Sequence, residues 1–136
     1  DLYRESLFRR MLWRLGVTPK GAESDSALVQ SIEAALIASR VEIDRFFFDW
    51  QGGSRRAASP ADPAYAEENF ADVRQRLAGY QSARPLGHPY WAGEAPVSMS
   101  IETVENLWAH IAERDDWGPL YAHIEAVREM GRAMLA

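Results

Sequence analysis

The chain has 136 residues, of which 47% are hydrophobic and 26% charged, with a formal net charge of −5 and no cysteine. This length supports one domain with a single core, and the composition is typical of a folded globular protein. The absence of cysteine excludes disulfides, thiolate metal sites and a cysteine nucleophile, and it favours a cytoplasmic protein. The negative charge argues against general nucleic-acid binding, and no apolar run is long enough to suggest a membrane span.

The first 40 residues predict two helices separated by a short turn. Apolar residues recur at helical spacing over Leu2–Leu15, and Gly16 can end this helix because glycine adopts positive φ without cost. Several arginines give the same helix a basic side, which we interpret as a solvated surface in preference to an anion or partner patch. Ser24 or Asp25 is expected to cap the second helix. Its apolar stripe is Leu28, Ile32, Ala35, Leu36 and Ser39.

The run VEIDRFFFDWQGG, residues 41–53, predicts a third helix over Glu42–Gln51 that the two glycines end. Val41 and Phe48 lie on a different side of this helix from its main apolar face, and Phe48 is roughly 140° from Ile43. A helix that is apolar on two sides is central to a fold or contacts another surface. Val41 and Phe48 are therefore candidate interface residues, and an exposed Phe48 would indicate a missing partner. The main face consists of Ile43, Phe46, Phe47 and Trp50.

A polar loop over Ser54–Pro60 leads to a predicted fourth helix, with Asp62 as N-cap and Pro63 at its first position. The segment Gln81–Met99 contains three prolines and two glycines and cannot be a regular helix. We interpret it as a loop that packs on itself, and a lid over a ligand is the alternative. Tyr90 and Trp91 are its expected anchors and further candidate interface residues. The apolar stripe of the fourth helix is Ala66, Phe70, Val73, Leu77 and Tyr80.

Two more helices complete the predicted fold. Ser98 or Ser100 starts the fifth, which ends near Glu113, and a turn at Asp115–Pro119 supplies the cap of the sixth. No strand pair and no internal repeat is visible. We therefore predict an all-α fold: a compact bundle of five or six helices in a single domain, residues 1–136, with one long Pro/Gly-rich loop. Its expected core residues are Phe46, Phe47, Trp50, Phe70 and Trp108.

No set of residues in the sequence predicts a self-sufficient active site. His110 and Glu113 have the i, i+3 spacing of paired ligands, but no Glu-x-x-His occurs, so we expect no metal site. Asp44 and Asp49 flank the aromatic run, where a carboxylate can have a raised pKa. Both fall on the polar flanks of the helix, so salt bridges or capping contacts explain them as well. Nucleophile-elbow and glycine-rich phosphate-binding motifs are absent.

Three stretches of the chain together resemble a known family. RMLWRLGV and VEIDRFFFDWQGG are similar to the C-terminal helical region of selenoprotein O-like proteins, and HPYWAGEAPVSMSIETVENLWAHIAERDDW is similar to the closing segment of that family. The similarity extends roughly over residues 8–117. Two family features are absent here: the redox-active cysteine or selenocysteine, and an Arg-Asn pair whose neighbourhood holds Ser100 and Ile101.

The resemblance implies a parent protein with a protein-kinase-like fold that binds ATP with magnesium and transfers AMP to protein side chains. The nucleotide-binding and metal-binding residues of that family lie upstream of this region, so no catalytic, cofactor or metal residue is assigned to this chain. We expect a fragment of a longer protein, which braces the kinase-like lobe or guides protein substrate. Its partner is then the remainder of that polypeptide or another protein.

Two alternatives come from other classes of protein. The chain could be an independent helical module for protein interaction or oligomerisation, because large aromatic residues are enriched at protein interfaces. It could also be a small enzyme that uses Asp44, Asp49 or His88 near the long loop. The sequence upstream of Asp1 would separate these hypotheses most directly.

Overall fold

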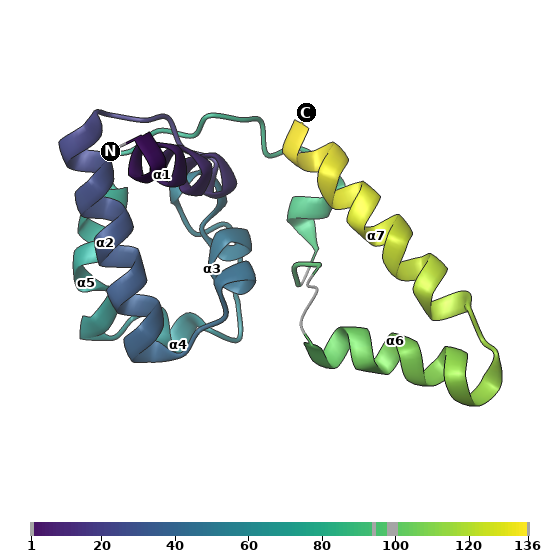
Figure 1. Ribbon diagram of the computed structural model, residues 1–136. Coiled ribbons are helices and arrows are strands. Elements are labelled where there is room, and N and C mark those ends of the chain that lie inside the picture. Colours follow the sequence, from purple (N-terminus) through teal and green to yellow (C-terminus); the bar gives the residue numbers. More distant parts are fainter. Residues whose placement is uncertain (1, 94, 98–100, 136) are drawn as a thin grey trace. The chain divides into compact units, whose positions relative to one another are not determined.

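The computed structural model describes residues 2–93, 95–97 and 101–135, and every named element in this described part is a helix (Figure 1). The prediction of an all-α fold is confirmed. The described residues form seven α-helices and three short 3-10 helices, where the sequence predicted five or six helices. The chain divides into two compact units, Asp1–Leu86 and Gly87–Ala136, with the boundary inside the predicted Pro/Gly-rich loop. The single domain suggested by the length stays a prediction.

The first unit begins with α1 (Leu2–Leu15) and α2 (Ala22–Ser39). Helix α1 ends as predicted at Gly16, whose φ is 74° and whose N–H donates to the carbonyl of Leu12. Helix α2 begins earlier than predicted, and Gly21 rather than Ser24 or Asp25 occupies the N-cap position. The Asp25 carboxylate instead accepts the backbone N–H groups of Lys20 (3.1 Å) and Gly21 (3.3 Å), so it holds the turn that precedes the helix.

Helix α3 (Ile43–Asp49) lies at the centre of this unit, followed by a 3-10 turn, η1 (Gln51–Gly53). Phe46 is fully buried, and its ring lies 6.1 Å from that of Phe70. Ile43, expected on the same buried face, is exposed at the start of the helix. The core cluster of the unit consists of Leu12, Leu15, Val17, Leu28, Ile32, Ala35, Phe46, Phe47, Trp50, Tyr65, Phe70, Val73, Leu77 and Tyr80.

The predicted fourth helix is broken into α4 (Asp62–Tyr65), η2 (Glu68–Phe70) and α5 (Ala71–Leu77). In a continuous helix, residues five positions apart point about 140° away from each other. The break places both Tyr65 and Phe70 in the core, with ring centroids 5.2 Å apart, while Ala66 of the predicted stripe is exposed. Arg74 donates to the carbonyls of Tyr65 and Glu67 at the break, and the Glu67 carbonyl also accepts the N–H of Phe70.

The loop that follows α5 has two parts with different contacts. Its first part lies along the segment after α1: Thr18 donates to the Gln81 carbonyl (2.8 Å), and Ala83 donates to the Gly16 carbonyl (2.8 Å). Its second part belongs to the other unit and contains η3 (Pro89–Ala92), which packs against α7. The His88 Nε2 lies 3.4 Å from Glu129 of α7, while its Nδ1 accepts the N–H of Tyr90.

The second unit is completed by α6 (Ile101–Arg114) and α7 (Gly118–Leu135), joined by a tight turn (Figure 1). Asp116 accepts the N–H of Gly118, so the acidic turn supplies the start of α7 as predicted. The expected starting residues of the fifth helix, Ser98 and Ser100, lie outside the described residues. No residue of α6 is buried, and in α7 only Ala133 is buried among the described residues.

Candidate functional site

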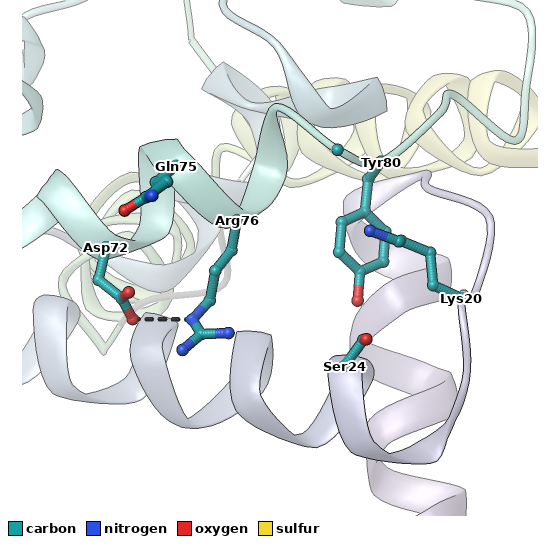
Figure 2. Close-up of a pocket in the computed structure, with 7 residues that line it drawn as sticks. Lys20, Ser24, Asp72, Gln75, Arg76 and Tyr80 are labelled. Atoms are coloured by element: carbon teal, nitrogen blue, oxygen red, sulfur yellow. Dashed lines mark hydrogen bonds and ion pairs between the residues drawn. The ribbon is translucent and has the colours of Figure 1, made fainter.

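A polar hollow of about 320 Å³ lies between the start of α2 and the end of α5 (Figure 2). Lys20 lies in the turn before α2, Ser24 lies in the first turn of α2, and Arg76 lies on α5. These two elements pack side by side in the first unit. The hollow is lined by Lys20, Ser24, Asp72, Gln75, Arg76, Gly79 and Tyr80.

The two cations of the hollow are held by neighbouring groups. The backbone of Lys20 is fixed by its hydrogen bond to Asp25, and its amine lies 5.1 Å from the centroid of the Tyr80 ring. Arg76 donates through Nε to Asp72 (2.9 Å), one helical turn earlier on α5. Figure 2 shows Lys20 and Ser24 on one side of the hollow and Arg76 with Asp72 on the other.

The carboxylates around the hollow are already engaged by donors. Asp25 is buried and accepts the Tyr80 hydroxyl (2.6 Å) in addition to the two backbone N–H groups before α2. Burial, together with this hydrogen bond, raises the pKa of Tyr80 above its usual value, so Tyr80 acts as a neutral donor. Hydrogen bonds from Ser31 and Arg76 hold the pKa of Asp72 below its usual range.

These contacts leave the Lys20 amine and the Nη groups of Arg76 without a hydrogen bond or ion pair to any described residue. Two cations face the hollow against the single carboxylate of Asp72, which Arg76 neutralises. The arrangement is suited to binding an anion. It contains no nucleophile with an adjacent base, so it gives no support to covalent catalysis.

Asp44 and Asp49, considered as carboxylates of a small enzyme, have structural contacts. Asp44 forms an ion pair with Arg14 of α1 (2.9 Å). Asp49 is buried rather than on a polar flank, and it accepts the hydroxyls of Ser59 (2.6 Å) and Tyr65 (2.7 Å) besides its ion pair with Arg45. Asp49 thus connects α3 to the loop and helix that follow it.

The histidines also occupy local structural positions. His88 contacts Glu129 and its own 3-10 turn, as described above. The Nδ1 of His110 lies 2.9 Å from the carbonyl of Asn106, and Glu113 is exposed. Within the described residues, no group of three or more His, Asp or Glu side chains could hold a metal ion.

The four candidate interface residues are largely covered by the chain itself. Phe48 is only 6% exposed, and the Arg56 guanidinium lies 5.2 Å from its ring centroid. Val41 is half-buried and packs against the core cluster. In the second unit Trp91 is 5% exposed, and its ring lies 4.9 Å from the half-buried Tyr90. The exposed Phe48 that would have indicated a missing partner is not observed.

Exposed large apolar residues occur on several helices, and α6 is one of them. Trp108, predicted as a core residue, is 63% exposed, and Ile101 and Val104 are 77% and 46% exposed. The prediction that Trp108 belongs to the core is wrong: α6 packs against α7 within the second unit, and none of its residues is buried. Amphipathic spacing identified these residues as buried, but it does not specify what covers them.

Sequence reasoning missed the polar hollow because its two cations are far apart in the sequence and belong to no motif. One signal was present: Lys20 is the only lysine among the 15 basic residues. No protein-family model matches this chain, and no curated protein or solved structure matches it either. Among the described residues, no helix is both long enough and apolar enough to cross a membrane.

Proposed function

We propose that this chain is the non-catalytic C-terminal helical domain of a selenoprotein O-like protein AMP transferase, where it braces the kinase-like lobe or guides protein substrate. The observation on which the proposal depends is the uncovered apolar face of α6. The three sequence stretches that resemble the family support the identity of the parent. A cytoplasmic location and a protein partner are parts of the same proposal, and ATP and magnesium would be bound by the parent rather than by this chain.

The exposed face of α6 has the properties of a contact surface. Ile101, Val104 and Trp108 fall within about 60° of one another around the helix. Single exposed apolar residues are ordinary, but a contiguous patch of this kind indicates a binding surface. Full burial of a large apolar side chain contributes about 1.5–3 kcal/mol, so covering these three residues would be strongly favourable.

The negative charge beside the apolar face of α6 indicates what kind of surface a partner would present. Glu102, Glu105 and Glu113 are exposed and lie along one flank of the apolar strip, and none forms an ion pair with a described residue. A complementary partner would present apolar side chains bordered by arginine or lysine. A protein surface meets that description, which supports a partner within or bound to the parent polypeptide.

The first test is to read the coding sequence upstream of Asp1. The proposal expects a kinase-like region with its nucleotide-binding lysine and glutamate and a metal-binding Asp-Phe-Gly segment in the same frame. A reading frame that starts at this chain would overturn the assignment to the family. The alternative of an independent interaction or oligomerisation module would then explain the same exposed face.

The second test compares hydrogen exchange in the full polypeptide and in residues 1–136. The amides of α6 should exchange more slowly in the full polypeptide, and Trp108→Ser should reduce that difference. Ile37→Ser is the matched control, because Ile37 is a single exposed apolar residue on α2. Equal exchange of α6 in both proteins would refute a bracing role, and self-association of the isolated chain in light scattering would favour the alternative.

A further inference from the structure

We propose that the hollow between α2 and α5 binds the phosphoryl group of a small phosphorylated molecule, with Lys20 and Arg76 as its cationic ligands. This inference concerns only the first unit and does not depend on the proposed parent protein. It follows from three properties of the hollow: the two cationic donors, the oriented guanidinium of Arg76 and the polar lining.

Two cationic donors adjoin the hollow even though the whole chain has a net charge of −5. The carboxylates of Asp72 and of nearby Asp25 accept hydrogen bonds from groups other than the Lys20 amine. The amine therefore faces open space, with the Tyr80 ring as its nearest favourable contact. The amine and the Nη groups of the guanidinium, which adjoin one hollow from separate elements, are therefore both able to donate to an anion that enters it.

The Arg76 guanidinium is oriented before any ligand arrives, and a hydrogen bond to Asp25 fixes the backbone of Lys20. The Arg76 guanidinium is oriented by its Nε bond to Asp72, so its planar Nη edge remains available for a bidentate contact. Gly79 adjoins the Lys20 amine: a Cβ there would lie 3.0 Å from the Lys20 Nζ, and the amine would have to shift. Preorganised groups lose less conformational freedom on binding, which favours a specific site over a diffuse surface charge.

The lining selects the chemistry of the ligand. Guanidinium pairs match phosphate oxygens geometrically, and a lysine amine adds a compact positive charge. Ser24 supplies a hydroxyl in the first turn of α2, a helix that has no side-chain cap at its N-terminus. A volume of about 320 Å³ exceeds the space needed by a phosphoryl group, so part of a small polar molecule fits beside it. The mainly polar lining disfavours an apolar ligand.

The lone lysine makes the site directly observable. Protein labelled with carbon-13 at lysine Cε gives one lysine side-chain signal, from Lys20, in NMR spectra of residues 1–136. The probes are inorganic phosphate and O-phosphoserine, titrated at constant ionic strength, with sodium acetate as the carboxylate comparison. We expect a saturable shift of the Lys20 signal with both phosphoryl probes, and at least a threefold weaker response to acetate.

Variants decide whether the response comes from this hollow. Arg76→Gln should weaken the apparent affinity for phosphate at least threefold, and Lys20→Gln should weaken it similarly when binding is followed by phosphorus-31 linewidths. Arg10→Gln is the control, because it removes an equal charge from an exposed position on α1. Its affinity should be unchanged. Circular dichroism of each variant verifies that the helices are retained.

Three results would overturn the inference. One is a Lys20 signal that shifts linearly without saturation, because that indicates only ionic screening. Another is an equal loss of affinity in Arg10→Gln and Arg76→Gln, which indicates general electrostatic attraction. The third is tighter binding of acetate than of phosphate, which would assign the hollow to a carboxylate. A response to O-phosphoserine but not to inorganic phosphate would support the site and show that the ester part contributes.

Discussion

Gln51 offers the sharpest test of how the first unit is held together. This side chain is 1% exposed and lies where α1, α3 and the loop after α5 meet. Its amide nitrogen donates to the carbonyls of Arg14 (2.7 Å) and Phe47 (3.0 Å). Its amide oxygen accepts from Arg84 (2.9 Å), whose guanidinium is partly buried and therefore has a lowered pKa. One side chain thus satisfies polar groups from three segments.

The change Gln51→Met keeps the size of the side chain and removes all three hydrogen bonds. A neutral hydrogen bond contributes about 1 kcal/mol and a bond to a charged group about 1.5–3 kcal/mol. The three lost hydrogen bonds therefore contribute about 3.5–5 kcal/mol to the free energy of unfolding. Burial of the apolar methionine side chain offsets part of this loss. We expect the free energy of unfolding to fall by about 2–4 kcal/mol.

The measurement is urea-induced unfolding followed by circular dichroism, with Gln75→Met as the matched control on the exposed side of α5. An exposed substitution of this kind changes stability by about 0.5 kcal/mol or less. If Gln51→Met is no more destabilising than Gln75→Met, the three hydrogen bonds do not stabilise the unit, and the reasoning is refuted. A change in the slope of the transition would indicate instead that the two units unfold separately.

Three further results are expected. Gly16→Ala should be more destabilising in urea than Gly21→Ala. Both glycines have positive φ, but only at Gly16 would the new Cβ clash with another atom, the Gln51 Oε1, and equal losses of stability would contradict this. Burial raises the pKa of Tyr65 and Tyr80, so the stability from their neutral forms is complete below about pH 10 and is lost at higher pH. Both tyrosines should ionise only as the chain unfolds, in a late phase of an absorbance titration toward high pH. Tyr65→Phe should remove one ionisation from that late phase. Ionisation of all tyrosines in a single step, with the helices intact, would refute this prediction. Hydrogen bonds from the Ser59 amide and Arg55 lower the pKa of Asp62, so the ionised carboxylate stabilises the fold above about pH 4. This stabilisation is lost as the pH falls further. The stability of Asp62→Asn should therefore depend less steeply on acidic pH in the same denaturation assay.

Local sequence signals predicted the elements that local interactions determine. The bounds of α1 follow from its apolar spacing and from Gly16, and the burial of Phe46 and Phe70 follows from helical periodicity. The interruption between Tyr65 and Phe70 could not be predicted this way. It depends on two aromatic rings reaching one core and on Arg74 donating to the carbonyls at the break, and both are tertiary effects.

The polar sites were harder to predict for the same reason. Asp49 has the sequence surroundings of an exposed helix flank, yet the Ser59 and Tyr65 hydroxyls from a later segment enclose it. The Lys20 and Arg76 hollow requires α2 and α5 to pack together, which no spacing in the sequence specifies. Periodicity indicates which face of a helix is apolar, whereas the pairing of faces is determined by the whole fold.

The positions of Phe48 and Trp108 change which surface is informative about a partner. The sequence predicted an interface on the second apolar side of α3. Arg56 and the surrounding unit cover Phe48, so this side needs no partner to bury it. Helix α6 differs: it has a clear amphipathic pattern, it packs against α7 within the second unit, and its tryptophan is exposed. Since the three phenylalanines of α3 are buried within the first unit, the effects of α3 on folding and of α6 on association can be tested separately. Substitutions on α3 should alter folding, whereas Trp108→Ser should alter association and leave the helix content of the isolated chain unchanged.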